Sequence, residues 1–205
     1  MIIKRFVTGP LENNIYLLVD EKTKQAVLID ATALIPEIED AVKATGADVN
    51  FILLTHGHFD HIMGLNNLKE ALDAQAVINK NDLVLSDNIN EFTRMFNQPD
   101  SKPPVYEKFV EDNDIIQVGD MVIKVITTPG HTEGGVCYLV DGNLFSGDTL
   151  FRESVGRTDL TGGSFEKLSD SIKNKLFKLP DDTKVYPGHG PMTTIEHEKQ
   201  YNELI

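Results

Sequence analysis

Short apolar runs alternate with amphipathic stretches through the first third of the chain. The apolar runs lie at residues 2–8, 15–20, 26–30 and 49–54. Their composition favours strands, and the run at 26–30 is typical of a strand buried on both faces. Residues 35–44 and 62–72 carry apolar residues at helical spacing, with Pro36 near the start of the first stretch and Gly46 just past its end. The pattern predicts strands that alternate with helices.

The pattern is less regular between residues 79 and 114. Asparagine and proline residues interrupt the apolar spacing there, at Asn88, Asn90, Asn97, Pro99, Pro103 and Pro104. We expect one or two helices and a long surface loop, inserted beside the core. Because the chain has no low-complexity segment and no Ser/Gly linker, the sequence predicts one α/β domain over residues 1–205.

The second half of the chain predicts two hairpins, two helices and a last strand. The hairpins span 115–128, turning at Gly119-Asp120, and 136–146, turning at Asp141-Gly142. Ser164 is placed to cap a helix that runs to Leu179, and Thr193 or Thr194 to cap a closing helix. The last strand is expected at residues 183–186.

The charge balance narrows the function. Among 205 residues, 32 are acidic and 19 are Lys or Arg, which gives a net charge of −13. This sign repels phosphate backbones and anionic lipid, so we expect neither nucleic acid nor a membrane as a partner. The chain has no apolar run near the ~18 residues of a membrane span and no signal-peptide pattern at its start, so the expected location is the cytoplasm. Its one cysteine, Cys137, excludes an internal disulfide and is expected to be a buried apolar residue.

Five of the six histidines follow predicted strands. They are His56, His58, His61, His131 and His189. Asp148 follows the strand at 143–146 in the same way. Neutral imidazole and carboxylate are the usual ligands of catalytic zinc, iron and manganese, and neighbouring strand ends converge on one rim of an α/β sheet. The sequence therefore predicts a metal site on that rim, whereas His197, between two acids, is expected only at the surface.

The ordered motif His-x-His-x-Asp-His at residues 56–61, followed by His131, Asp148 and His189, resembles the metallo-β-lactamase superfamily. The resemblance covers the whole chain and implies a four-layer αββα sandwich with metals at one edge of the sheets. The implied ligands of the first ion are His56, His58 and His131, those of the second are Asp60, His61 and His189, and Asp148 bridges the two. Asp30 matches an aspartate that orients the histidine loop from behind the ligands.

The resemblance implies two divalent metal ions as cofactors. Zinc is expected first, with iron or manganese as alternatives, because imidazole and carboxylate suit all three. Two such ions lower the pKa of a water to near ~7. Asp60 and Asp148 are the expected catalytic residues, as metal ligands first, and Asp60 also as an acceptor of the water proton.

Several branches of the superfamily depart from this sequence. Enzymes that hydrolyse antibiotics usually place cysteine where Asp148 stands, and flavodiiron proteins place glutamate where His58 stands. Nuclease branches carry an inserted domain or a basic arm. The best resemblance is to the glyoxalase II-like group, the hydroxyacylglutathione hydrolases, in its short bacterial form. It rests on residues 147–151, 156–159 and 187–194.

The expected function is metal-dependent hydrolysis of acyl thioesters such as S-lactoylglutathione. The chain ends before the basic helical region that holds glutathione in the longer enzymes, so we expect weak binding of that substrate. Arg157 is the candidate substrate-binding residue, or else forms a structural ion pair with Asp159. The alternatives are a mononuclear-iron persulfide dioxygenase, which shares the Gly-Arg-Thr-Asp run, and a metal-binding module without hydrolase activity. The thiol carrier and the oligomeric state stay open.

Overall fold

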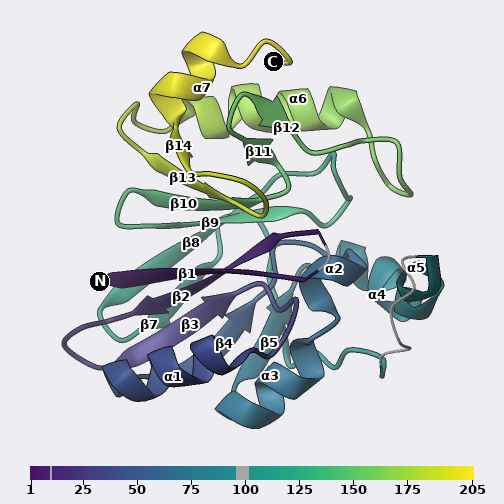
Figure 1. Ribbon diagram of the computed structural model, residues 1–205. Helices are drawn as coiled ribbons and strands as arrows, with labels where there is room; N and C mark the ends of the chain where they lie inside the picture. The colour runs from purple at the N-terminus through teal and green to yellow at the C-terminus, as the bar shows by residue number, and fades with distance from the viewer. Residues whose placement is uncertain (10, 96–101) are drawn as a thin grey trace.

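Two six-stranded sheets lie face to face in the computed structural model, which describes residues 1–9, 11–95 and 102–205 (Figure 1). The first half of the chain forms one sheet and the second half forms the other. Helices cover the outer face of each sheet, which completes the four-layer αββα arrangement implied by the resemblance. Of the residues named above, Asn97 and Pro99 lie outside the described residues.

The first sheet has the strand order β1-β2-β3-β4-β5-β6. Its strands are β1 (Ile2–Thr8), β2 (Asn13–Val19), β3 (Gln25–Ile29), β4 (Asp48–Leu53), β5 (Gln75–Ile78) and β6 (Lys108–Phe109). Strands β3 to β6 are parallel, and helices α1 (Pro36–Thr45) and α3 (Leu65–Leu72) provide two of the crossovers between them. Parallel pairing brings the carboxyl ends of β4 and β5 to the same edge of the sheet.

The second sheet has the strand order β14-β13-β10-β9-β8-β7. Its strands are β7 (Ile115–Val118), β8 (Met121–Thr127), β9 (Val136–Val140), β10 (Asn143–Gly147), β13 (Lys184–Pro187) and β14 (Thr193–Thr194). The two predicted hairpins are confirmed as β7–β8 and β9–β10. Helices α6 (Phe165–Asn174) and α7 (Ile195–Tyr201) cover the outer face, and their caps are Ser164 and Thr194, as predicted.

Several elements differ from the sequence pattern. The stretch predicted as one helix over 62–72 is two helices, α2 (Phe59–Ile62) and α3. They separate at Gly64, where a Cβ atom would lie 2.6 Å from the Cα of Ala33, so the backbone packs closely against a neighbouring loop. The helix predicted to reach Leu179 ends at Asn174, and a 3₁₀ turn, η2 (Leu176–Lys178), follows it.

The described part of the segment over 79–114 contains the two helices expected there, together with a 3₁₀ turn and a strand that were not expected. It contains the 3₁₀ turn η1 (Lys80–Asp82) and the helices α4 (Leu83–Asp87) and α5 (Ile89–Met95). Its later part supplies β6, which extends the first sheet beyond β5. The sequence pattern did not predict β5, β6, β11 (Leu150–Phe151), β12 (Ser154–Val155) or β14. All of these except β5 have two residues each, which is too few to show alternation.

Three apolar clusters separate the four layers. Strand β2 shows how the alternation of a strand divides them, because it is buried on both faces. Ile15 and Leu17 join the cluster under the helices of the first sheet, whereas Tyr16 and Leu18 join the cluster between the sheets. The third cluster lies under α6 and α7 and includes Cys137, which is fully buried as predicted. Within the described residues, no helix has the length and apolar character that a bilayer crossing needs.

Candidate metal centre

The fold brings all seven predicted metal ligands to one end of the sandwich. The loop after β4 and the short helix α2 supply His56, His58, Asp60 and His61. The residues after β8, β10 and β13 supply His131, Asp148 and His189. The sequence pattern placed these strand ends on one rim of a single sheet. That expectation is wrong in one respect, because β4 lies in the first sheet and the other three strands lie in the second.

The ligand atoms form three overlapping groups, each with its atoms within 4.8 Å of one another. The groups are His56, His58 and His131; His56, His61 and Asp148; and Asp60, His61 and His189. Two of them match the ligand sets implied by the resemblance. Asp148 lies between these two sets, with Oδ2 3.6 Å from His131 Nε2 and 3.5 Å from His189 Nε2.

Acceptors behind three of the histidines fix which ring nitrogen faces the cluster. Nδ1 of His131 lies 2.7 Å from the carbonyl oxygen of Arg157, and Nδ1 of His189 lies 2.9 Å from that of Leu11. A carbonyl oxygen only accepts, so each Nδ1 carries a proton, and Nε2 is the ring nitrogen that can offer a lone pair to a metal ion. His61 has the same arrangement, because its Nδ1 lies 2.8 Å from Asp30 Oδ2.

Asp30 also acts on His56 through Thr55. The Thr55 hydroxyl donates to Asp30 Oδ2 at 2.9 Å, so its oxygen accepts the Nδ1–H of His56 at 3.0 Å. The backbone N–H of Thr55 donates to Asp30 Oδ1 at 2.8 Å. One buried carboxylate thus contacts the histidine loop at its start and at its end, the position that the resemblance implies for Asp30.

The electrostatics of the cluster divide its ligands into two sets. Burial lowers the pKa values of His61 and His189, but the neighbouring Asp148 and Asp60 outweigh it, so the pKa of His61 lies well above its usual value and that of His189 rises to about 9. A metal ion would have to displace a proton from each of these two rings, whereas the other ligands favour the binding form.

Burial lowers the pKa of His58 to about 3 and the pKa of His56 well below its usual value, so both rings are neutral at pH 7. Burial opposes ionisation of Asp60 and Asp148, but the charge of His61 outweighs it. The pKa of Asp60 is lowered to about 2, and the pKa of Asp148 lies well below its usual value. Both carboxylates are ionised at neutral pH.

Three buried ligand atoms have no hydrogen-bond partner among the described residues. They are Nε2 of His56, Nε2 of His58 and Oδ1 of Asp148. Buried polar atoms are rarely left without a partner, because each costs desolvation free energy. Neutral imidazoles beside carboxylates are a donor set that suits zinc, iron and manganese. The residues present therefore fit divalent metal ions.

Asp82 is a buried acid beneath the cluster that the sequence pattern does not distinguish. It ends η1, inside the segment predicted as an insertion beside the core. Its carboxylate accepts from Gly57 N at 2.9 Å, from Thr132 Oγ1 at 2.8 Å and from Gly134 N at 2.6 Å. Burial raises the pKa of Asp82. The donors lie 25 to 52 residues away in the chain, so no local motif could have identified it.

Asn13 is a second polar residue of the site that the sequence pattern assigns only to a turn. The structure places it at the start of β2, fully buried. Its Nδ2 donates to Asp60 Oδ2 at 2.8 Å, and its backbone forms an isolated bridge with His189. Asn13 therefore connects the first sheet to two ligands of the implied second ion.

Arg157 and His197 lie outside the ligand groups. The guanidinium of Arg157 is exposed and binds both carboxylate oxygens of Asp159 at 2.7 Å. Only its backbone carbonyl reaches the cluster, through His131. The ring of His197 lies 2.8 Å from Glu153 on the surface. Within the described residues, the ion pair with Asp159 corresponds to the structural alternative for Arg157.

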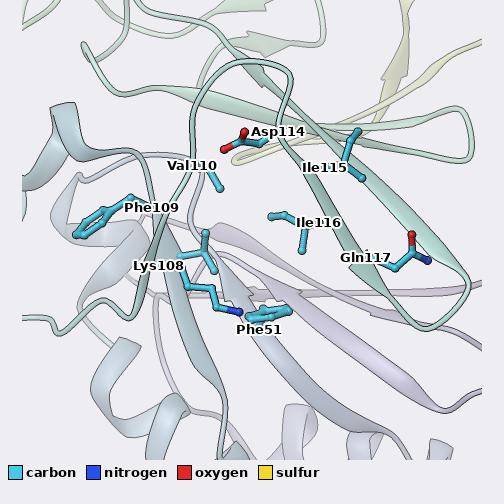
Figure 2. Close-up of a pocket in the computed structure, with 9 residues that line it drawn as sticks. Phe51, Lys108, Phe109, Val110, Asp114, Ile115, Ile116 and Gln117 are labelled. Carbon is cyan, nitrogen blue, oxygen red and sulfur yellow. The ribbon is translucent and has the colours of Figure 1, made fainter.

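A cavity of about 270 Å³ opens between the two sheets at the edge formed by β6 and β7 (Figure 2). Figure 2 shows Lys108 beside Phe51, and Lys108 Nζ lies 4.3 Å from the centre of that ring. Ile116 also lines the cavity. None of the lining residues is a predicted ligand, so this cavity is separate from the metal centre.

Two proteins named as probable metallo-hydrolases are similar to the chain over most of its length. The chain is 38% identical to the probable metallo-hydrolase M6_Spy0554 of Streptococcus pyogenes, over 95% of this chain and 85% of that protein. It is 34% identical to the probable metallo-hydrolase YqgX of Bacillus subtilis, over 98% of this chain and 96% of that protein.

Solved structures show the same similarity in three dimensions. The BLEG-1 B3 metallo-beta-lactamase superposes with a TM-score of 0.90 at 32% identity, covering 98% of both chains. TTHA1623 in a di-iron-bound form gives 0.89 at 35% identity, covering 98% of this chain and all of that chain. ETHE1 from Myxococcus xanthus gives 0.81 at 31% identity, covering 99% of this chain and 84% of that chain.

A family model connects these likenesses to the histidine cluster. It is described as the metallo-beta-lactamase superfamily, and it matches residues 8–189, from the end of β1 to the last predicted ligand. The matched span contains every residue of the three ligand groups. With its αββα layers and its buried histidines and carboxylates, this chain belongs to the metallo-β-lactamase superfamily.

Proposed function

We propose that the protein is a dinuclear metal-dependent hydrolase of acyl thioesters, similar to glyoxalase II. The observation that carries the proposal is the meeting of two ligand groups at Asp148, which approaches His131 of one group and His189 of the other. The names of the two metallo-hydrolase relatives and the di-iron form of TTHA1623 support it. The proposed ions are two divalent metals, with zinc expected before iron or manganese.

The residues of the chain would divide the chemistry among them. Bound divalent ions supply Lewis acidity, which polarises a carbonyl and lowers the pKa of water. His56, His58 and His131 would hold one ion, while Asp60 and its partners His61 and His189 would hold the other, with Asp148 shared. Asp60 is ionised at neutral pH, and Asn13 holds its Oδ2, so this carboxylate is positioned to accept a proton.

A thioester suits this site because its leaving group needs little assistance. A thiol has a pKa of about 8.5, so its anion departs without a general acid. The one cysteine of the chain is no alternative nucleophile, because Cys137 is fully buried and burial raises its pKa to about 11. The proposed partner is therefore a small-molecule thioester, with S-lactoylglutathione as the first candidate and neither nucleic acid nor a membrane involved.

A mononuclear-iron persulfide dioxygenase is the second candidate. Its support is the Gly-Arg-Thr-Asp run at residues 156–159 and the structural likeness to ETHE1 of Myxococcus xanthus. Such an enzyme uses one iron ion, so it needs the ligands of only one metal position. It would consume oxygen in the presence of glutathione persulfide, which a hydrolase does not.

Elemental analysis of the purified protein, paired with three assays, tests the proposal. The hydrolase reading predicts about two metal equivalents and turnover of S-lactoylglutathione or another acyl thioester, with no oxygen uptake. One iron equivalent with oxygen uptake would identify the dioxygenase instead. Metal without either activity would indicate a binding module. The third assay uses a β-lactam, because of the likeness to BLEG-1, and we expect no turnover of it.

A further inference from the structure

Asp82 joins the two loops that carry the three-histidine group, His56, His58 and His131. Gly57 lies between the first two histidines, and its N–H donates to Asp82 Oδ2 at 2.9 Å. On the other side, Thr132 Oγ1 donates to the same oxygen at 2.8 Å, and Gly134 N donates to Oδ1 at 2.6 Å. One fully buried carboxylate therefore binds a loop of the first sheet and a loop of the second.

Both loops approach Asp82 so closely that only glycine fits at the contact. A Cβ atom on Gly57 would lie 2.7 Å from the backbone oxygen of Asp82, and one on Gly134 would lie 2.7 Å from Asp82 Oδ1. Real Cβ atoms do not approach other atoms this closely, so a side chain at either position would push the loop away. These two glycines place each ligand loop directly against the carboxylate.

The relative position of the two loops decides whether the three histidines can share an ion. His58 Nδ1 lies 2.9 Å from His131 Nε2, so the two rings converge from opposite sheets. A backbone bond, from Val136 N to Thr55 O at 2.8 Å, also joins the two chain segments, but on the second segment it lies at the start of β9, five residues after His131. Asp82 is the side chain that fixes them at the histidines themselves. Groups behind metal ligands typically change metal affinity 10–100-fold.

We propose that Asp82 is a positioning residue that sets the metal affinity of the three-histidine group separately from the rest of the centre. This inference rests on the metal centre proposed above. Asp30 differs from Asp82, because it bonds directly to His61 and also acts on His56 through Thr55. Within the described residues, the carboxylate of Asp82 accepts from Gly57, Thr132 and Gly134, and from none of Asp60, His61 and His189.

Titration of metal-free protein with cobalt(II), followed by visible absorption, tests this assignment. The wild-type protein should take up two equivalents. In Asp82→Asn, the three-histidine group should bind about 10- to 100-fold more weakly, with an altered absorption band, while the other equivalent keeps its affinity. Zinc competition against a chromophoric chelator should give the same order of affinities.

The matched control is Glu198→Gln. Glu198 is buried and also accepts three bonds, from Glu153 N, Thr193 Oγ1 and Asn202 Nδ2, and none of these donors belongs to a ligand group. This variant should lose stability without changing either affinity. If Asp82→Asn fails to fold, Thr132→Val removes one donor from Asp82 and should weaken the same equivalent, and Thr132→Ser should restore it.

The outcomes separate this inference from the proposed function. A wild-type protein that binds no metal would overturn the proposed function, and the inference with it. A wild-type protein that binds two ions, beside an Asp82→Asn variant with unchanged affinities, would overturn the role of Asp82 alone. If Asp82→Asn weakens the affinity for both metal equivalents equally, the role of Asp82 is also overturned, because that result would indicate a general effect on the structure.

Discussion

Each histidine of the three-histidine group is a donor that the other two cannot replace. The ring of His131 is held from behind by the carbonyl of Arg157, so its Nε2 faces the cluster. We expect His131→Ala to lose about one metal equivalent and to reduce thioester hydrolysis by orders of magnitude, because water activation depends on both ions. Metal analysis and initial rates check this. Full activity in the variant would contradict the ligand assignment.

His197→Ala is the control for that experiment. Its ring bonds to Glu153 on the surface and belongs to none of the ligand groups of the described residues. Metal content and turnover should therefore stay at the wild-type values. Loss of a metal equivalent would show that the ligand set is incomplete.

Arg157 has a side chain and a backbone with separate partners. Its guanidinium pairs with Asp159, while its carbonyl orients His131. Arg157→Ala removes only the exposed pair, so KM for S-lactoylglutathione should change less than about twofold and the loss of stability should be small. Steady-state kinetics and thermal unfolding measure both quantities. A large rise in KM at unchanged kcat would instead show that the guanidinium binds substrate.

At the level of single residues, the sequence predicts the candidate metal ligands but not the groups that form hydrogen bonds to them. The ligand motif is visible because His56, His58 and His61 stand within six residues and the remaining donors follow strand ends. Asp82 and Asn13 are not visible, because each acts on residues more than 20 positions away. Backbone acceptors such as Leu11 carry no signal at all, since any residue has a carbonyl.

Among the elements, the sequence predicts the ends of a helix where its own residues set them, and fails where a contact with a distant segment sets them. Helix α1 begins at Pro36 and ends at Gly46 in the left-handed conformation, as the local residues favour. The break between α2 and α3 arises instead because Gly64 N donates to Ala31 O across a loop contact. No spacing of apolar residues within 62–72 reports that contact.

Two turns from opposite sheets are joined by Asp20. This residue follows β2, and its carboxylate accepts from Asp120 N in the β7–β8 turn at 2.6 Å and from Thr23 Oγ1 at 2.7 Å. The bond from Asp120, followed by that from Thr23, holds the pKa of Asp20 well below its usual value. A carboxyl whose pKa is lower in the folded state stabilises the fold above its unfolded pKa of about 3.9.

That stabilisation should disappear as the pH falls below about 4 toward the folded-state pKa. We therefore expect Asp20→Asn to have a lower Tm than the wild-type protein at pH 7, with a difference that shrinks in acid. Thermal unfolding at a series of pH values measures the difference, and other carboxyls cancel in the comparison. A difference that stays constant down to pH 3 would assign the effect to lost packing rather than to the charge.

For the whole molecule, the pattern of apolar residues predicts an α/β fold, and only the family resemblance adds the four layers. Strand pairing such as β10 with β13, more than 30 residues apart, cannot be read from local periodicity. The same long-range pairing assembles the site, since four predicted ligands follow the first sheet and three follow the second.

Bound metal should therefore stabilise the contact between the two halves of the fold. A chelator such as EDTA should lower Tm, and added zinc should restore it. A ligand that binds only the folded state contributes about 4 kcal/mol when its free concentration is about 1,000 times Kd. Differential scanning calorimetry measures the shift. A Tm that does not respond to chelation of fully loaded protein would show that the ions do not join the sheets.

The division of the ligands between the two sheets also sets an order of events during synthesis. Four of the seven proposed donors have been made once residue 61 is added, but the last, His189, follows His61 by 128 residues. A nascent chain therefore carries an incomplete cluster until β13 and His189 have been synthesised. Capture of both proposed ions would then follow the arrival of β13 beside β10.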